Sequence, residues 1–244
     1  RSWATSPCVR SDDVRVSTNE KELPMTRVGV LLSGCGYLDG SEIHEAVLTL
    51  LALDRLGATA VCFAPDVAQS AVMDHAKKKA TKEKRNVLVE AARIARSQVA
   101  DVATAKAEEL DALVLPGGFG AAKNLSDFAA NGAKAKVEPG VLALVRAMHA
   151  AKKPIGAWCI APSVLALALG KDGPALTIGN DPETAKVLES LGAKHLECTV
   201  TQICVDEEQR IVTTPAYMYD AKISDVARGI ERGVKAVLAL AKRG

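Results

Sequence analysis

Short apolar runs alternate with longer amphipathic segments along most of this chain. A continuous apolar run of about four to eight residues is typical of a strand that is buried on both faces. Such runs occupy residues 27–33, 58–65, 110–118, 153–159 and 175–179. The segments between them repeat apolar residues at helical spacing, which predicts helices that each pack through one face. These helices are expected at residues 41–57, 86–97, 138–151, 161–169, 181–193 and 220–241.

Strands that alternate with helices in this way pair in parallel through right-handed crossovers. We therefore predict an α/β fold, a three-layer sandwich with a mostly parallel central sheet. Residues 195–216 depart from this pattern, because they alternate with a period of two on both sides of a polar turn. They predict a small β-hairpin near the C-terminus. Residues 66–85 are charged and unpatterned, and we expect an irregular excursion there.

Residues 1–24 carry neither pattern. They are polar, include acidic residues and lack the apolar stretch of a secretory signal. Met25 follows and directly precedes the first predicted strand. We therefore expect residues 1–24 to be a non-native or disordered leader, Met25 to be the native start, and residues 25–244 to form a single domain.

Composition narrows the range of partners. The 244 residues carry a formal net charge of +2 without a basic stripe, so we expect no nucleic-acid partner. No apolar run approaches the roughly 18 residues of a membrane span, so we expect no membrane partner. The four histidines show no metal-ligand spacing, which predicts no metal site. The six cysteines form no CxxC pair, which is typical of a reducing compartment such as the cytoplasm.

Three predicted strands end in segments with unusual chemistry. The first strand leads into SGCGYLDG, the third into PGGFGAAKN, and the fourth ends in WCIAP. In an open parallel sheet, ligands bind outside the carboxyl ends of the strands. We therefore expect these three segments at one edge of the sheet, and their convergence is the main functional signal in the sequence.

Cys159 stands where a predicted strand turns directly into a predicted helix. This arrangement is a variant of the nucleophile elbow G-x-S-x-G, because Gly156 precedes the cysteine but no glycine follows two residues later. The dipole of the following helix stabilises a thiolate, which predicts a pKa below the usual ~8.5 for Cys159. The alternative is that Cys159 is one more small apolar side chain in the core.

Backbone N–H groups beside Cys159 are candidates for an oxyanion hole. A glycine pair after a strand lets such groups approach a ligand closely, so the N–H groups of Gly118 and Ile160 are expected near the sulfur. A tight turn without a catalytic part explains the glycines equally well. Four further residues of these loops are possible pocket residues: Cys35, Gly36, Gly117 and Asn124. For Cys35 a tight turn, and for Asn124 a capping role, is the alternative.

Glu45 lies in the first helix beside its apolar face. Burial there raises the pKa of a carboxyl group. A protonated carboxyl can donate a hydrogen bond to a thiolate, and an ionised one can take a proton from a substrate carbon. A solvated acid near a helix N-terminus is equally consistent with the sequence.

The combination of Glu45 on the first helix, PGG after a strand and a cysteine elbow resembles the ThiJ/PfpI superfamily, within the flavodoxin-like, class I glutamine amidotransferase-like fold. The stretches SGCGYLDGSEIHEA, PGGFGAAKNLSDFA and IVTTPAYM are similar to those of the ElbB branch, named for enhanced lycopene biosynthesis, which includes mitochondrial proteins of animals. The resemblance covers nearly everything from Met25 onward. It implies a homodimer, cytoplasmic in bacteria and mitochondrial in eukaryotes.

The resemblance also implies site residues and an activity. Cys159 matches the nucleophile, Glu45 its carboxylate partner, and Gly118 and Ile160 the oxyanion hole. The implied activity is that of a glyoxalase, which converts small dicarbonyls such as glyoxal to 2-hydroxy acids without glutathione, metal or another cofactor.

One departure from the family pattern keeps other functions open. The residue after Cys159 is not a histidine, and none occurs in TTPAYMYD, where the histidine partner of an amidotransferase would be sought. The first alternative is a non-enzymatic protein that senses redox state or binds a metabolite. The second is a glutamine amidotransferase-like subunit, which would need a histidine near the sulfur.

Overall fold

A seven-stranded sheet forms the centre of the molecule in the computed structural model, which describes residues 25–243. Its strands are β1 (Arg27–Leu31), β2 (Thr59–Ala64), β5 (Val99–Asp101), β6 (Ala112–Leu115), β7 (Ile155–Trp158), β10 (Cys204–Asp206) and β11 (Ile211–Thr214). They lie in the order β10-β11-β7-β6-β1-β2-β5. Every pair is parallel except β10 with β11, which forms the expected hairpin. The leader expected at residues 1–24 lies outside the described residues.

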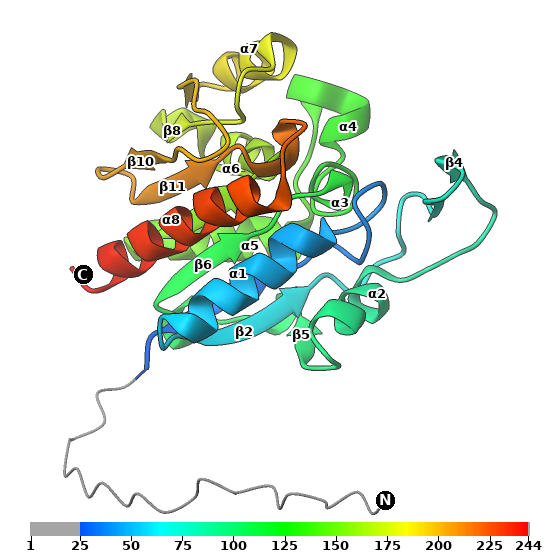
Figure 1. Cartoon of the computed structure of the whole chain (residues 1–244), viewed down its shortest axis with the longest axis horizontal. Helices are drawn as coiled ribbons and strands as arrows, with labels where there is room; N and C mark the ends of the chain where they lie inside the picture. The colour runs from blue at the N-terminus through cyan, green and yellow to red at the C-terminus, as the bar shows by residue number, and fades with distance from the viewer. Residues whose placement is uncertain (1–24, 244) are drawn as a thin grey trace, which may run out of the picture.

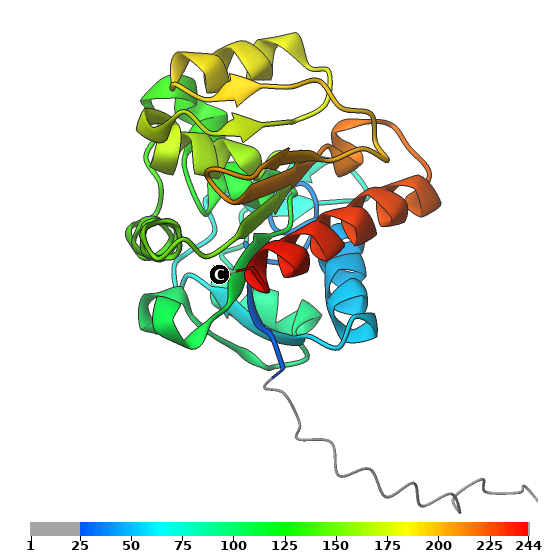
Figure 2. The same cartoon turned by 90° about the vertical axis from the view of Figure 1, so that its left-hand side faces the viewer.

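Helices cover both faces of this sheet, so the predicted three-layer sandwich is confirmed (Figure 1). One face packs against α1 (Ile43–Arg55), α2 (Val87–Ile94) and α8 (Ile223–Ala241). The other packs against α3 (Phe119–Lys123), α5 (Pro139–Ala150) and α6 (Pro162–Leu169). Figure 2 shows α1 and α8 on one side of the sheet and the green helices on the other.

The buried strands supply both cores because successive side chains point to opposite faces. Val28 and Val30 of β1 pack in the core beneath α1 and α8, whereas Leu31 packs in the core beneath α5 and α6. All three side chains are fully buried. This two-sided burial is the reason that the strands read as continuous apolar runs.

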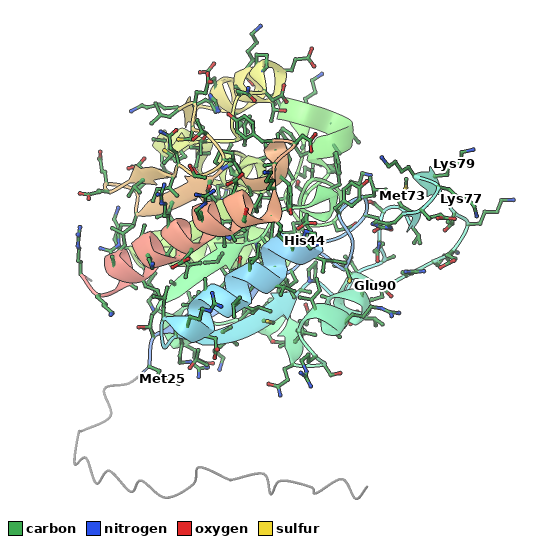
Figure 3. All side chains as sticks on the ribbon, viewed as in Figure 1. Met25, His44, Met73, Lys77, Lys79 and Glu90 are labelled. Carbon is green, nitrogen blue, oxygen red and sulfur yellow. The ribbon has the colours of Figure 1, made fainter. Side chains whose placement is uncertain are left out.

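Several small elements surround the sheet. β3 (Met73–Asp74) and β4 (Lys79–Ala80) form an antiparallel pair within the expected excursion, and the labelled Met73, Lys77 and Lys79 stand away from the body of the molecule (Figure 3). β8 (Ala175–Leu176) pairs in parallel with β9 (Lys194–His195), and α7 (Pro182–Ser190) connects them. The remaining short helices are α4 (Phe128–Asn131), η1 (Val102–Thr104), η2 (Ala107–Glu109), η3 (Gly132–Lys134), η4 (Gly170–Asp172) and η5 (Ala216–Met218).

The predicted helices are all present, but two strand predictions need correction. The strand expected at residues 175–179 is confined to β8, which belongs to a separate two-stranded sheet and not to the central one. In the alternating segment 195–216 the hairpin is confined to residues 204–214, because residues 196–203 form no strand. The edge strand β5 has no counterpart among the predicted runs. Within residues 25–243, no helix combines the length and the apolar character needed to span a membrane.

Trp158 connects the end of β7 to the helices α1 and α8. Its indole is fully buried, and the indole N–H donates to Thr49 Oγ1 of α1 at 3.0 Å. On the opposite side the ring packs against Gly233 of α8, where an added Cβ would lie 2.7 Å from the Cη2 atom of Trp158. The residue that follows Trp158 is Cys159, so this packing fixes the position from which the sulfur projects.

The substitution Gly233→Ala tests this packing. Alanine normally stabilises a helix interior relative to glycine, but here the methyl group would overlap the Trp158 ring. We expect the free energy of unfolding in urea to fall by roughly 1–3 kcal/mol. The same substitution in a Trp158→Phe background should cost less, because the outer ring atoms are gone. An equal cost in both backgrounds would refute the proposed overlap.

Candidate active site

The three loops with unusual chemistry meet at one edge of the sheet, as expected. They follow β1, β6 and β7, which are adjacent strands. Backbone hydrogen bonds join the first two loops, from Gly120 N–H to the Gly40 carbonyl at 2.9 Å and from Phe119 N–H to the Tyr37 carbonyl at 2.8 Å. The Glu42 N–H, at the start of α1, also donates to the Gly117 carbonyl at 2.9 Å. The edge is therefore one connected unit.

Cys159 occupies a strained turn between β7 and α6. Its φ of 56° lies in the left-handed region, which a residue with a side chain rarely adopts. The Cys159 N–H donates to the Thr214 carbonyl of β11 at 3.0 Å, and α6 begins at Pro162. The turn is therefore the variant elbow expected from the sequence, and it holds the side chain at the rim of the sheet.

Glu45 is fully buried, so the interpretation of this residue as a solvated acid is wrong. Its Oε2 accepts the Gly117 N–H at 2.8 Å, and its Oε1 accepts the Tyr217 N–H at 3.2 Å. The Cys159 side chain lies beside the same carboxyl group and interacts with it. The acid of the first helix and the cysteine of the elbow thus form a buried pair.

Two glycines make this pair possible. A Cβ at Gly117 would lie 2.5 Å from Cys159 Cβ and 2.7 Å from Glu45 Oε2, so any side chain there would separate the two groups. Gly118 has a φ of 95°, a conformation that favours glycine. Its N–H and the Ile160 N–H are directed at the Cys159 side chain and act to lower the pKa of the thiol. Both predicted oxyanion donors therefore lie at the sulfur. From there they can also donate to an oxygen atom of a substrate whose carbon is bonded to the sulfur.

Burial dominates the acid–base properties of the pair. It raises the pKa of the Glu45 carboxyl to about 8, and the negative charge of Glu42 adds to the shift. Burial, followed by the charge of Glu45, also raises the pKa of the Cys159 thiol. The N–H groups of Gly118 and Ile160 act in the opposite direction but do not outweigh burial. The expectation of a lowered pKa for Cys159 is therefore wrong, because desolvation exceeds the stabilisation available at the helix N-terminus.

A cavity of about 330 Å³ opens above the pair. Gly118, Cys159 and Ile160 form its floor, and the residue Cys159 is 7% exposed. Tyr37, Phe119, Tyr217 and Met218 form apolar and aromatic walls. A small molecule in this cavity would therefore contact Cys159 through the small part of this residue that is exposed.

Three polar residues complete the lining: Glu42, Asp181 and Thr184. Glu42 caps α1 by accepting the Glu45 N–H at 2.7 Å, and Asp181 caps α7 by accepting the Glu183 N–H at 3.3 Å. None of these residues, nor the aromatic walls, was predicted from the sequence to line a pocket. The PAYM segment, which contains Tyr217 and Met218, was the available signal for part of this wall.

The remaining predicted pocket residues have other surroundings. Gly117 lies behind the pair, and Cys35, Gly36 and Asn124 do not line the cavity. Asn124 lies just past the end of α3, where its Nδ2 donates to the carbonyls of Ser33 at 2.9 Å and Asp39 at 2.8 Å. Its side chain therefore supports the first loop from below.

No histidine in residues 25–243 lines the cavity. Two histidines contact wall residues from outside the lining. The His44 Nδ1 is hydrogen-bonded to the Tyr217 hydroxyl at 2.9 Å, and Figure 3 shows His44 at the N-terminal end of α1. The centroid of the His75 ring lies 5.5 Å from that of the Tyr37 ring. The part of the chain that the structure describes also contains no group of His, Cys, Asp and Glu side chains suited to a metal ion.

Comparison with known proteins agrees with this geometry. A model of the DJ-1/PfpI family matches residues 36–222. The chain belongs to the DJ-1/PfpI family. It is 47% identical over 227 residues to the ES1 protein homolog, mitochondrial, of Rattus norvegicus, covering 89% of this chain and 85% of that protein. It is 44% identical over 227 residues to the glutamine amidotransferase-like class 1 domain-containing protein 3, mitochondrial, of Homo sapiens, covering 89% of this chain and 84% of that protein.

A solved structure supports the same family at the level of the fold. The crystal structure of an isoprenoid biosynthesis protein with an amidotransferase-like domain from Ehrlichia chaffeensis is 39% identical, with a TM-score of 0.83. The match covers 88% of this chain and 99% of that chain. The resemblance to the ThiJ/PfpI superfamily and its ElbB branch, inferred from the sequence, is thus confirmed.

The raised pKa of Glu45 predicts how the reactivity of Cys159 depends on pH. When the pair loses its first proton, Glu45 can take the thiol proton, so alkylation of Cys159 by iodoacetamide should rise through about pH 8. In Glu45→Gln no carboxylate can take the thiol proton, so the rise through about pH 8 should be absent and the reaction at that pH should be slower by roughly tenfold or more. Mass spectrometry of the peptide that contains Cys159 measures the rate. Identical profiles for the two proteins would contradict the coupling.

The same pKa predicts a pH-dependent stability. The folded protein keeps the Glu45 proton up to about pH 8, whereas the unfolded chain releases it near the ordinary value of 4.5. The unfolded state therefore binds fewer protons in this window, and stability falls as the pH rises. Urea titrations at several pH values should show a loss of up to about 1.4 kcal/mol per pH unit relative to Glu45→Gln. A difference between the proteins that stays constant with pH would contradict the buried, protonated acid.

Proposed function

We propose that this chain is a glyoxalase-type enzyme of the DJ-1/PfpI family, which converts a dicarbonyl compound to a 2-hydroxy acid through Cys159 with Glu45 as its acid–base partner. The observation that carries the proposal is the adjacent pair of a buried carboxyl group and a thiol beneath a cavity. A carboxyl group whose pKa is about 8 can both accept and return a proton near neutral pH.

The first step in this scheme is addition of sulfur to the aldehyde. Glu45, as a carboxylate, takes the thiol proton while the Cys159 sulfur bonds to the aldehyde carbon. The electron pair of the C=O bond moves to oxygen, where the N–H groups of Gly118 and Ile160 stabilise the charge. Protonation of that oxygen gives a hemithioacetal, and Glu45 returns to the carboxylate form when it supplies this proton.

The later steps convert the hemithioacetal to a hydroxy thioester by moving one proton between its two carbons and one between their oxygens. Glu45 takes the proton from the carbon bonded to sulfur, which gives an enediolate, and then returns it to the neighbouring carbon, while the hydroxyl proton on the first carbon passes to the oxygen of the second. The first carbon is thereby oxidised to a thioester and the second reduced to an alcohol, with no external oxidant or reductant. Water hydrolyses the thioester, releases the 2-hydroxy acid and restores the thiol. From glyoxal and water the product is glycolate.

The rival functions have less support from the geometry. Redox sensing depends on the thiolate, and burial raises the pKa of Cys159, which lowers the thiolate fraction at neutral pH. Amide hydrolysis needs an acid for the leaving group, and no histidine of the described chain lines the cavity.

Location and assembly follow the relatives in this proposal. Two mammalian relatives are named as mitochondrial, and we infer a mitochondrial location for this chain by similarity. A homodimer, which the family resemblance implies, is part of the same proposal.

Formation of glycolate from glyoxal tests the activity. Cys159→Ala should abolish turnover, because no covalent adduct can form. Glu45→Gln should lower kcat by roughly 10²–10⁴, the usual contribution of a general acid–base. Cys198→Ala, which removes a half-buried thiol outside the cavity, serves as the matched control and should keep full activity. Equal turnover by all four proteins would end the enzymatic proposal.

A further inference from the structure

The charged residues that line the cavity are all acidic. Glu42 and Asp181 contribute carboxylates, and no lysine, arginine or histidine in the described part of the chain contributes to the lining. Lys123 lies beside one wall: its Nζ is 5.2 Å from the centroid of the Phe119 ring and donates to the Leu38 carbonyl at 3.0 Å. This ammonium group is held outside the lining and has its own backbone partner. His44 and His75 contact the wall residues Tyr217 and Tyr37 from outside the lining.

Glu42 acts on the reacting groups from the wall. Glu42 lines the cavity, and within residues 25–243 only its Oε2 is paired with a donor, the Glu45 N–H at 2.7 Å. Its charge contributes to the raised pKa of both Glu45 and the wall residue Tyr217. The charge of Glu42 therefore acts on the acid of the reacting pair.

Aromatic rings complete this environment. Tyr37, Phe119 and Tyr217 line the same cavity as the two carboxylates. Cations bind favourably over aromatic faces, and carboxylates add a direct Coulomb attraction. A cavity of about 330 Å³ is also far larger than glyoxal requires and falls at the lower end of pockets that enclose larger ligands.

We propose that the physiological substrate is a carbonyl compound with an apolar body and a positively charged group, and that Glu42 and Asp181 select it. This inference deepens the proposed function and rests on it for the reaction, but the selection by charge can be tested separately. Carbonyl compounds that carry a carboxylate, such as 2-oxo acids, are repelled by the same two residues.

A cationic substrate would also activate the site. Its positive charge, placed against Glu42, offsets the negative charge of Glu42 that disfavours ionisation of Glu45. The pair then releases its proton more readily when the matching substrate is bound than when a neutral one is bound. Charge thus contributes to the reaction as well as to binding.

Charged thiol reagents test the selection without any turnover. Three methanethiosulfonates form disulfides with Cys159 and release methanesulfinate: the cationic trimethylammonium-ethyl, the neutral methyl and the anionic sulfonatoethyl compounds. Rates at the Cys159 peptide are measured by mass spectrometry and divided by those of free 2-mercaptoethanol. We expect the normalised cation-to-anion ratio to be about tenfold or more, and to decrease with added salt.

Matched variants identify the residues responsible. Glu42→Gln and Asp181→Asn keep an oxygen that can cap each helix but remove the charge, and each should move the ratio towards that of the free thiol. Glu189→Gln removes an exposed carboxylate from the far end of α7 and should leave the ratio unchanged. A wild-type ratio equal to that of the free thiol, a ratio insensitive to both lining variants, or no reaction of Cys159 with any reagent would overturn the proposal.

Turnover of phenylglyoxals with a para trimethylammonium group, hydrogen or carboxylate separates this inference from the proposed function. Higher kcat/KM for the cationic compound in the wild type, lost in Glu42→Gln, supports both proposals. A high reagent ratio with no turnover of any of the three compounds would refute the enzymatic function and leave charge selection as a property of a binding site. Turnover without preference among the three would refute the charge selection alone.

Discussion

A carboxyl group buried without a cation is the constraint on which the site depends. Glu45 has no positive partner; it has two backbone N–H donors and a thiol. An ionised carboxyl in such surroundings is costly, and the protein meets this cost by keeping the group protonated up to about pH 8. The donors come from the loop after β6 and from η5, so three distant segments must be in place before the acid is satisfied. The contacts that position Glu45 for catalysis are therefore the same contacts that stabilise it in the folded protein.

One side chain, Thr49, connects the acid to the strand that carries the cysteine. The Thr49 hydroxyl donates to the Glu45 carbonyl at 2.7 Å, and it accepts the indole N–H of Trp158, the residue before the nucleophile. A side-chain bridge thus joins the helix that carries the acid to the strand that carries the sulfur. Gly117 and Gly233 allow the approach, because a side chain at either position would overlap Cys159 or Trp158. The distance between acid and sulfur is therefore set by packing on the face of the sheet that α1 and α8 cover.

Much of this architecture could be predicted from the sequence, because its signals are local. Apolar runs mark β1, β6 and β7, and the abrupt change at Cys159 marks the elbow. The pKa of Cys159 was predicted with the wrong sign, because a helix dipole is visible in the sequence whereas the depth of burial is not. The walls were missed for a related reason. Tyr37 and Asp181 belong to loops far apart in the chain, and only the tertiary fold makes them neighbours.

The left-handed backbone at Cys159 has a consequence for how such a protein changes over generations. A residue with a side chain in this conformation costs roughly 1–3 kcal/mol, which glycine would largely recover. Replacement of Cys159 by glycine would therefore relieve backbone strain. Without selection for activity, such a substitution would give a more stable protein that lacks the nucleophile. Retention of sulfur at the elbow requires continuing selection for its chemistry.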